Sequence, residues 1–313
     1  MDVCSAQSSF YGPDAVRKPR FLLSLVRENN DYQRLQASAA VQAAERLGAE
    51  LQVTSANGDS IKQSQDLLTV IQTPSLHPDA LVVEPAGTPM PHVARAAAAA
   101  GIGWVVLNKR ADYLAELRSQ YKVPVFAISS DNEEIGRLQG QQLGVLLPRG
   151  GVALYIQGPA NTTSESRTTG LGQTKPKNIE LRTLRGDWTQ ESGHKAIEAW
   201  LRLSTSKDIP IGVVACQNDG MAMGARKALE LNGRLVGVPF IGVDGGPTTG
   251  QAWVRSGALA ATVILPPHAG IAIEMLVQTL QTGVSPPEYT LIPPQCHPSL
   301  KDLTAKMEKT HSA

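Results

Sequence analysis

Short apolar runs alternate with segments of helical periodicity along most of the chain. Residues 21–26 form an apolar-rich run, and residues 31–47 repeat apolar side chains along one side of a helix before Gly48 ends it. The same alternation predicts further strands at 51–54, 80–84, 104–107, 125–129, 151–156, 179–184, 211–216, 238–243 and 259–264. Helices are predicted at 60–72, 91–100 and 133–147 and in the later intervals.

Strands that are apolar throughout, each followed by a helix, are typical of parallel sheets covered on both faces. About ten such units exceed one ordinary open sheet. We therefore expect the α/β class, with two doubly wound parallel-sheet lobes and right-handed crossovers. A length of 313 residues is sufficient for two such domains.

The charge of the chain is nearly balanced, with 29 basic and 28 acidic residues and no dense basic run. Proteins that bind nucleic acid usually carry a basic face or stripe, so we expect no nucleic-acid partner. The longest apolar stretches fall well short of the ~20 residues of a transmembrane helix. Cys4, Cys216 and Cys296 are too scattered for a disulfide framework and are expected to be free thiols.

The first 18 residues are polar and contain Gly12 and Pro13, so we expect a flexible arm at 1–18. This stretch lacks the apolar core of a secretory signal. Either a signal was removed before this chain was made, or the protein stays in the cytoplasm, and both alternatives stay open at this point.

Polar segments follow most of the predicted strands. In doubly wound sheets, ligands bind outside the carboxyl ends of the strands, so these segments are the candidates for a site. They are rich in Asn, Asp, Gln and Arg and poor in His and Cys. Their positions are 28–32, 84–87, 108–110, 130–132, 157–167, 217–219 and 244–246. Planar groups that donate and accept in pairs indicate recognition of a polar ligand rather than catalysis.

The chain lacks the motifs of common catalytic, metal and cofactor sites. Its six histidines are isolated, with no metal-ligand spacing. No G-x-S-x-G nucleophile elbow closes a strand, and neither a P-loop nor a G-x-G-x-x-G follows the first strand, where Arg27-Glu28-Asn29-Asn30 stands instead. We therefore expect no catalytic residues, no metal and no cofactor, and a binding protein rather than an enzyme.

Four motifs occur in a fixed order along the chain. They are Ser130-Asp131-Asn132 at the start of a predicted helix, Gln217-Asn218-Asp219-Gly220-Met221-Ala222-Met223-Gly224-Ala225, Ile241-Gly242-Val243-Asp244-Gly245, and Gly257-Ala258-Leu259-Ala260-Ala261-Thr262-Val263 with Pro267 and Gly270 after it. Together they resemble the ribose- and galactose-type periplasmic solute-binding proteins, the type I periplasmic binding proteins. The resemblance extends from about residue 20 to about residue 300. Effector domains of lactose-repressor-like regulators share this fold.

The resemblance implies two lobes joined by a three-crossing hinge, with crossings near 127–129, 265–266 and 282–287. It implies an N-terminal lobe of residues 19–128 plus 266–285. The C-terminal lobe is then 129–265 plus 286–300, with a tail at 301–313.

The resemblance also implies that residues at the sheet ends hold sugar hydroxyls and that an aromatic ring covers the apolar face of the sugar. The matching positions are Asn30, Tyr32, Asn108, Lys109, Arg167, Trp188, Asn218 and Asp244. Asn and Asp can engage two adjacent hydroxyls, the Arg guanidinium is forked, and a Trp face covers C–H groups.

Each of these residues has a simpler interpretation. Asn218 and Asp244 stand next to predicted helix starts and could serve only as caps. Arg167 could be solvated on its helix, and Trp188 could pack in the core. The pair after the fourth strand could form an ordinary loop, and the tyrosine could pack within the first helix.

The chain departs from the ribose-type pattern at several places. The usual Asp-Arg pair after the fourth strand is Asn108-Lys109, and the usual glutamine after the Ala-Thr-Val strand is Leu265. The paired phenylalanines near the first helix are reduced to Asp31-Tyr32. These departures make ribose itself doubtful.

Two further expectations follow from these departures. The segment 110–123 is longer than usual, which indicates an altered lid or rim. Fewer acceptors beside Lys109 and Arg167 would suit a ligand with a carboxylate or phosphate, or a less hydroxylated sugar.

Together, the residues and the resemblance predict a solute-binding receptor that closes on a small polar ligand, a sugar or a sugar derivative. Its partner would be a membrane transporter permease or a sensor protein, and its location periplasmic by the resemblance. The alternative is a cytoplasmic ligand-sensing effector module of a regulator that lacks its own DNA-binding headpiece, because the polar residues before Phe21 leave no room for a helix-turn-helix.

Overall fold

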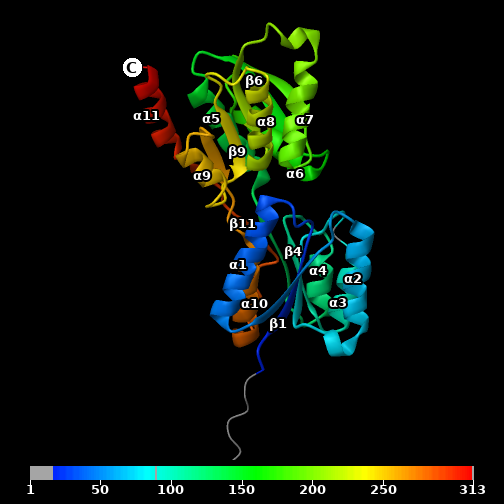
Figure 1. Cartoon of the computed structure of the whole chain (residues 1–313). Coiled ribbons are helices and arrows are strands. Elements are labelled where there is room, and N and C mark those ends of the chain that lie inside the picture. Colours follow the sequence, from blue (N-terminus) through cyan, green and yellow to red (C-terminus); the bar gives the residue numbers. More distant parts are fainter. Residues whose placement is uncertain (1–16, 89, 312–313) are drawn as a thin grey trace, which may run out of the picture.

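The computed structural model describes residues 17–88 and 90–311, so most of the expected arm at 1–18 lies outside the described residues. Two α/β lobes lie one above the other, each built on a six-stranded sheet (Figure 1). This arrangement confirms the predicted fold class.

The first lobe contains a parallel sheet in the order β11-β5-β4-β3-β1-β2. Its strands are β1 (Arg20–Leu25), β2 (Glu50–Ser55), β3 (Ala80–Val83), β4 (Gly103–Leu107), β5 (Val125–Ser130) and β11 (Tyr289–Ile292). Its helices are α1 (Asp31–Leu47), α2 (Ser60–Gln72), α3 (Pro91–Ala99), α4 (Leu114–Gln120) and α10 (His268–Thr282), with a 3₁₀ turn at Pro74–Leu76. Helices α1 and α10 cover one face of the sheet, and α2, α3 and α4 cover the other.

The second lobe has the strand order β12-β10-β9-β8-β6-β7, with β12 antiparallel to β10 and the other pairs parallel. Its strands are β6 (Gly151–Gln157), β7 (Ile179–Arg185), β8 (Ile211–Cys216), β9 (Phe240–Asp244), β10 (Ala261–Ile264) and β12 (Gln295–His297). Its helices are α5 (Asn132–Leu146), α6 (Thr162–Thr174), α7 (Gln190–Leu201), α8 (Asp219–Leu231), α9 (Gly250–Arg255) and α11 (Leu300–His311), with a 3₁₀ turn at Ser204–Ser206. Helices α5, α6 and α11 pack on one face, and α7, α8 and α9 on the other.

Three connections join the lobes. The first leads from β5 to α5 at Asp131, the second from β10 to α10 through residues 265–267, and the third from β11 to β12 at Pro293-Pro294. The first two lie within a few residues of the expected crossings. The expected third crossing at 282–287 is wrong, because that segment joins α10 to β11 within the first lobe.

The end of the chain also divides differently from the expected lobe boundaries. The resemblance assigns 286–300 to the C-terminal lobe, but β11 pairs with β5 in the first sheet. Within this stretch, β12 belongs to the second sheet. Residues 301–311, expected as a tail, lie in α11, whose Leu303 is fully buried in the core of the second lobe.

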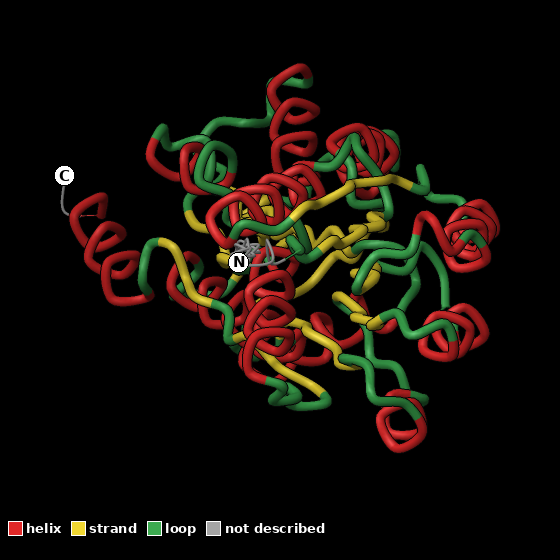
Figure 2. Tube along the Cα trace, turned by 90° about the horizontal axis from the view of Figure 1, so that it is seen from below, coloured by secondary structure: helices red, strands yellow, loops and turns green. Residues whose placement is uncertain are grey.

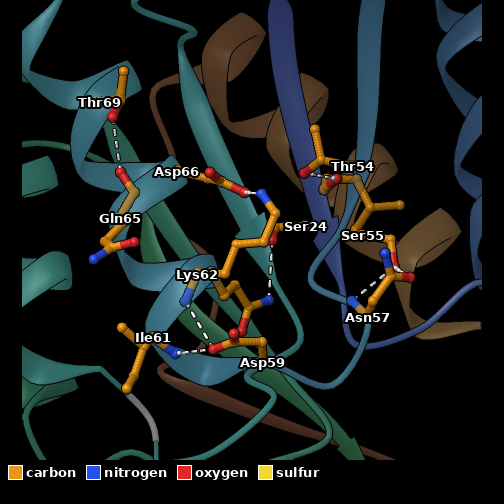
Figure 3. Close-up of polar contacts among 12 residues, drawn as sticks. Ser24, Thr54, Ser55, Asn57, Asp59, Ile61, Lys62, Gln65, Asp66 and Thr69 are labelled. Atoms are coloured by element: carbon orange, nitrogen blue, oxygen red, sulfur yellow. Dashed lines mark hydrogen bonds and ion pairs between the residues drawn. The ribbon is translucent and has the colours of Figure 1, made fainter.

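Side-chain caps begin several helices directly after a strand end. In α2, Asp59 accepts hydrogen bonds from the backbone N–H groups of Ile61 and Lys62, both at 2.9 Å (Figure 3). Similar N-caps start α1, α5, α6 and α8. Because a cap residue is polar and sits at the carboxyl end of the preceding strand, this local requirement also places polar side chains at the sheet edge.

The segment 110–123 forms α4 rather than an altered lid. Leu114 and Leu117 are buried in the core of the first lobe. Trp104 donates a hydrogen bond from Nε1 to the hydroxyl of Tyr113 at 3.1 Å. Through α4, this segment therefore contributes to one covered face of the sheet.

Seen from below, the strands lie at the centre of the molecule and helices surround them (Figure 2). None of the helices in the described part of the chain is long and apolar enough to cross a membrane.

Candidate ligand-binding site

A cavity of about 370 Å³ lies between the lobes, at the carboxyl ends of strands from both sheets. All eight residues predicted from the sequence line it. The first lobe contributes Asn30, Tyr32, Asn108 and Lys109, and the second contributes Arg167, Trp188, Asn218 and Asp244. This volume falls within the roughly 300–1,000 Å³ of small-molecule sites in proteins.

Asn30 and Asn218 are helix caps as well as cavity residues. Asn30 caps α1 by accepting from the backbone N–H of Gln33 at 3.2 Å, and Asn218 caps α8 by accepting from that of Met221 at 2.8 Å. Each side-chain amide also donates to the carbonyl oxygen of Trp188 at 2.9 Å. Asn218 therefore serves as a helix cap, but not only as one, because the same side chain also fixes the aromatic wall.

The ring of Trp188 forms that wall. Its backbone has a φ of 58°, a conformation that a large side chain rarely adopts. A Cβ placed on Gly158 would lie 2.2 Å from the ring, so only glycine allows this close approach. The ring thus lines the cavity and also packs against the core of the second lobe.

Arg167 is buried rather than solvated on its helix. Its Nε donates to Oδ1 of Asn132 at 3.0 Å, and its Nη1 donates to the carbonyl oxygen of Gln217 at 2.6 Å. The guanidinium carbon lies 5.5 Å from the centroid of the Trp188 ring, a cation–π contact. Burial lowers the pKa of Arg167, and the nearby Asp244 partly offsets that effect.

Asp244 ends β9 with a φ of 110° and is not the cap of a helix. Its carboxylate makes no hydrogen bond to any described residue. Burial raises the pKa of Asp244 well above its ordinary value, the neighbouring Asp219 raises it further, and Arg167 lowers it.

Asp219 lies behind this strand end. It accepts hydrogen bonds from the hydroxyl of Thr262 at 2.7 Å and from the backbone N–H of Gly245 at 2.8 Å. It therefore holds the residue that follows Asp244.

Tyr32 presents its hydroxyl at the floor of the cavity, 3.0 Å from Nδ1 of His268 and 3.4 Å from Oδ1 of Asn108. Burial, followed by the charges of Glu84 and Asp244, raises the pKa of Tyr32 well above its ordinary value, so the phenol is neutral. Nδ2 of Asn108 is a buried donor without a partner among the described residues.

Glu84 lines the cavity beside these residues, and the sequence did not single it out within the candidate segment 84–87. It is 9% exposed and accepts a hydrogen bond from Nε2 of Gln33 at 2.8 Å. Burial raises the pKa of Glu84, and the side-chain amides of Gln33 and Asn108 and the charge of Lys109 partly offset that shift. Lys109 itself donates to the carbonyl oxygen of Gly87, and burial lowers its pKa.

At the rim, an ion pair joins the lobes, because Arg27 lies 3.2 Å from Asp187. The sequence did not indicate these two residues, and it did not single out Asn132 and Asn161 within the candidate segments 130–132 and 157–167, although all four line the cavity. Only the position after a strand end could have indicated Arg27, Asn132 and Asn161, and many unselected residues share that position. Leu265, where the ribose-type pattern has glutamine, lines the cavity as a buried apolar residue.

Backbone strain gathers at this cavity. Five non-glycine residues in the described ranges have positive φ, and three of them, Asn108, Trp188 and Asp244, line the cavity. Such conformations cost of order 1–3 kcal/mol each and persist where the surrounding structure requires them, often at ligand sites. Among the described residues, no group of three or more His, Cys, Asp or Glu side chains could hold a metal ion.

A family model described as a periplasmic binding protein domain matches residues 21–283. The chain belongs to the periplasmic binding protein family. Within this family it is similar to the D-apiose import binding protein of Actinobacillus succinogenes, with 25% identity over 265 residues, 82% of this chain and 81% of that protein. It is also 27% identical over 277 residues to the D-xylose-binding periplasmic protein of Escherichia coli, which covers 85% of this chain and 78% of that protein.

Solved structures of periplasmic binding proteins share the fold. A solute-binding protein of an ABC transporter from Actinobacillus succinogenes, solved with bound D-allose, has a TM-score of 0.77 at 22% identity, covering 89% of this chain and 97% of that one. The Caulobacter myo-inositol binding protein has a TM-score of 0.76 at 21% identity, covering 91% and 95%.

Proposed function

We propose that this protein is a solute-binding receptor that closes on a neutral, polyhydroxylated ligand, a sugar or a cyclic polyol. The proposal rests first on which polar atoms of the cavity are free to bind. Asp244 has no hydrogen-bond partner among the described residues, and Glu84 accepts one hydrogen bond, from the side-chain amide of Gln33. A cavity with free acceptors favours a ligand rich in hydroxyl donors.

Each basic side chain of the cavity has a partner within the protein. Arg27 pairs with Asp187, Lys109 donates to a backbone carbonyl, and Arg167 donates to two protein oxygens. The cavity is lined by three basic and three acidic side chains, namely Arg27, Lys109, Arg167, Glu84, Asp187 and Asp244. This balance favours a neutral ligand over the carboxylate or phosphate that the sequence alone would suit.

The two lobes contribute different parts of the recognition. Tyr32, Glu84 and Asn108 belong to the first lobe, whereas the Trp188 ring and Asp244 belong to the second. A ligand between them contacts both lobes and therefore stabilises the closed state relative to the open one.

Names of related proteins support the transport role. The relatives from A. succinogenes and E. coli are an import binding protein and a periplasmic binding protein, for D-apiose and D-xylose respectively. We infer that this chain delivers its ligand to the permease of an ABC importer and acts in the periplasm.

The chain is not expected to convert its ligand into a product. Saturable binding of the ligand with no product formed would establish this.

A thermal-shift screen tests the proposed ligand class. The panel contains D-ribose, D-xylose, D-allose, D-galactose and myo-inositol, with ribose 5-phosphate and D-galacturonate as anions. A ligand at a hundred times its Kd adds about 2.7 kcal/mol of stability. This corresponds to a rise in Tm of roughly 5–10 °C for lobes of this size.

Two variants make the screen specific. D244N should lose the shift, and D112N, which changes a fully exposed aspartate on the first lobe, should keep it. A shift with the anions alone would contradict the proposal, as would an unchanged shift in D244N.

A further inference from the structure

A buried histidine lies beneath the cavity, next to two of the three connections between the lobes. His268 is the first residue of α10, directly after the second connection, and its side chain is fully buried. Its Nε2 lies 3.0 Å from Oγ of Ser130, the last residue of β5 before the first connection. Its Nδ1 lies 3.0 Å from the hydroxyl of Tyr32, which lines the cavity.

The surrounding groups indicate the direction of these hydrogen bonds. Oδ1 of Asn108 can only accept, so the Tyr32 hydroxyl directs its proton toward Asn108 and accepts from the imidazole. A neutral imidazole with its proton on Nδ1 then has a free lone pair on Nε2, which accepts from the hydroxyl of Ser130. The chain of donors therefore runs from Ser130 through His268 and Tyr32 to Asn108.

This arrangement also orients the amide of Asn108. Because Oδ1 of Asn108 accepts from Tyr32, its buried Nδ2 is left to face the carboxylate of Glu84, whose pKa the Asn108 amide lowers. The rings of Tyr32 and His268 meet edge to face, with centroids 6.5 Å apart and planes at 70°, so packing holds the tyrosine as well.

The surroundings of His268 favour its neutral form. Burial lowers its pKa to about 4, and the positive end of the α10 dipole disfavours a second proton. The ionisable groups on the elements around it are Tyr32 on α1, Glu84 after β3, Lys109 after β4, Asp131 at the first connection, Arg167 on α6 and Asp244 at the end of β9. The lowered pKa of His268 is caused by burial and not by the charge of any of these groups.

We propose that His268 is a positioning residue for ligand binding: through its Nδ1–H it orients the Tyr32 hydroxyl, and through Tyr32 the amide of Asn108, at the floor of the cavity. Its bond to Ser130 anchors the ring at the end of β5. The ring itself does not touch the ligand. This inference rests on the proposed function only for its binding measurement.

The first test needs no ligand. In protein with labelled histidine, ¹H–¹⁵N spectra of the imidazole identify the tautomer, and the signal that disappears in H268N is that of His268. We expect the Nδ1–H form, unchanged between pH 8 and pH 5, and a changed Nδ1 shift in Y32F. A proton on Nε2, or titration near the ordinary value of about 6.5, would overturn the proposal without bearing on the receptor function.

The second test separates the two ring nitrogens. An Asn side chain at 268 places its amide near the position of Nδ1, and a Gln side chain reaches the position of Nε2. Kd is measured for whichever of D-ribose, D-xylose, D-allose, D-galactose and myo-inositol gives the largest thermal shift. We expect H268N to stay within about threefold of the wild type and H268Q to bind at least tenfold more weakly.

Folding is monitored by circular dichroism, and H92Q, at an exposed histidine of α3, serves as the matched control. Equal losses in H268N and H268Q would indicate packing alone and would overturn the proposal. Unchanged affinity in both variants would overturn it too, as would the reverse order of affinities. If no panel member binds, the proposed ligand class fails, and the spectra still decide the position of the proton.

Discussion

Asn30 and Asn218 donate hydrogen bonds to the same acceptor, the carbonyl oxygen of Trp188, each at 2.9 Å. Asn30 belongs to the first lobe, whereas Asn218 and Trp188 belong to the second. One of these bonds therefore joins the lobes, and the other fixes the aromatic wall within its own lobe. The Arg27–Asp187 ion pair adds a second contact between the same two loops.

This relationship predicts different effects for two similar substitutions. Serine also caps helices well but is too short to reach the Trp188 carbonyl, so N30S and N218S keep their caps and lose one bond each. N30S should bind the selected panel sugar about tenfold more weakly, which corresponds to about 1.4 kcal/mol. It should also raise the radius of gyration of the unliganded protein, measured by small-angle X-ray scattering.

N218S is the matched control for that experiment. It loosens the wall within one lobe, so it should weaken binding while leaving the unliganded radius of gyration unchanged. Equal radii of gyration for N30S and the wild type would show that the bond between Asn30 and Trp188 does not contribute to closure.

Asp244 is expected to destabilise the unliganded protein and to be required for ligand binding. Its φ of 110° is a conformation that glycine adopts freely, and its partly buried carboxylate has no hydrogen-bond partner among the described residues. D244G should therefore stabilise the unliganded protein by about 1 kcal/mol and remove detectable sugar binding. Urea unfolding without ligand and calorimetric titration with the panel sugar measure the two effects. A D244G protein less stable than the wild type would contradict this account.

The close approach of Gly158 to the Trp188 ring gives a steric prediction. In G158A the new methyl group would lie 2.2 Å from the ring, so the ring must move out of its place in the wall. We expect at least a tenfold loss of affinity and a changed near-ultraviolet circular dichroism signal. In contrast, a Cβ on Gly172, an exposed glycine of α6, meets nothing within 4 Å. G172A should keep its affinity and gain about 0.5–1 kcal/mol of stability.

Elements such as α1 were predictable because two independent signals in the sequence agreed: the apolar pattern of the element and the residues that begin and end it. The predicted helix at 31–47 matches α1, where an apolar stripe lies between the Asn30 cap and Gly48 at the C-cap. The strands β11 and β12 were not predicted. They are short, and their exposed or partly exposed side chains give no continuous apolar run. Only their pairing with β5 and β10 makes them strands, and that pairing depends on contacts distant in the sequence.

The site was predictable as a set of strand-end residues but not as a set of roles. The resemblance placed eight residues at one cavity, and the structure brings all eight there. The sequence could not show that Arg167 donates hydrogen bonds to protein oxygens while the Asp244 carboxylate accepts none from the described residues. That difference depends on how the two side chains are oriented. Nor does any pattern distinguish His268 from the other histidines, since its burial results from two connections that meet in space.

Asp219 gives a pH dependence of stability whose sign can be worked out. Burial raises its pKa to about 7 in the folded protein, above the roughly 3.9 of an unfolded chain. Between these values the folded protein holds a proton that the unfolded chain has lost, so the free energy of unfolding falls as the pH rises. The decline is about 1.4 kcal/mol per pH unit while the two states differ by a full proton.

The variant D219N removes this contribution, together with the increase that Asp219 causes in the pKa of Asp244. Its amide oxygen can accept from the Gly245 N–H, and its amide nitrogen can donate to the Thr262 hydroxyl, so both hydrogen bonds remain without the titration. The difference in unfolding free energy, wild type minus D219N, should fall from pH 5 to pH 7 and level off above pH 8, as measured by urea unfolding. His268 contributes with the opposite sign, because its lowered pKa reduces stability as the pH falls, but it is present in both proteins and cancels in the difference. A difference that stays constant or rises between pH 5 and pH 7 would mean that Asp219 is ionised throughout this range, held by the Thr262 and Gly245 bonds despite its burial.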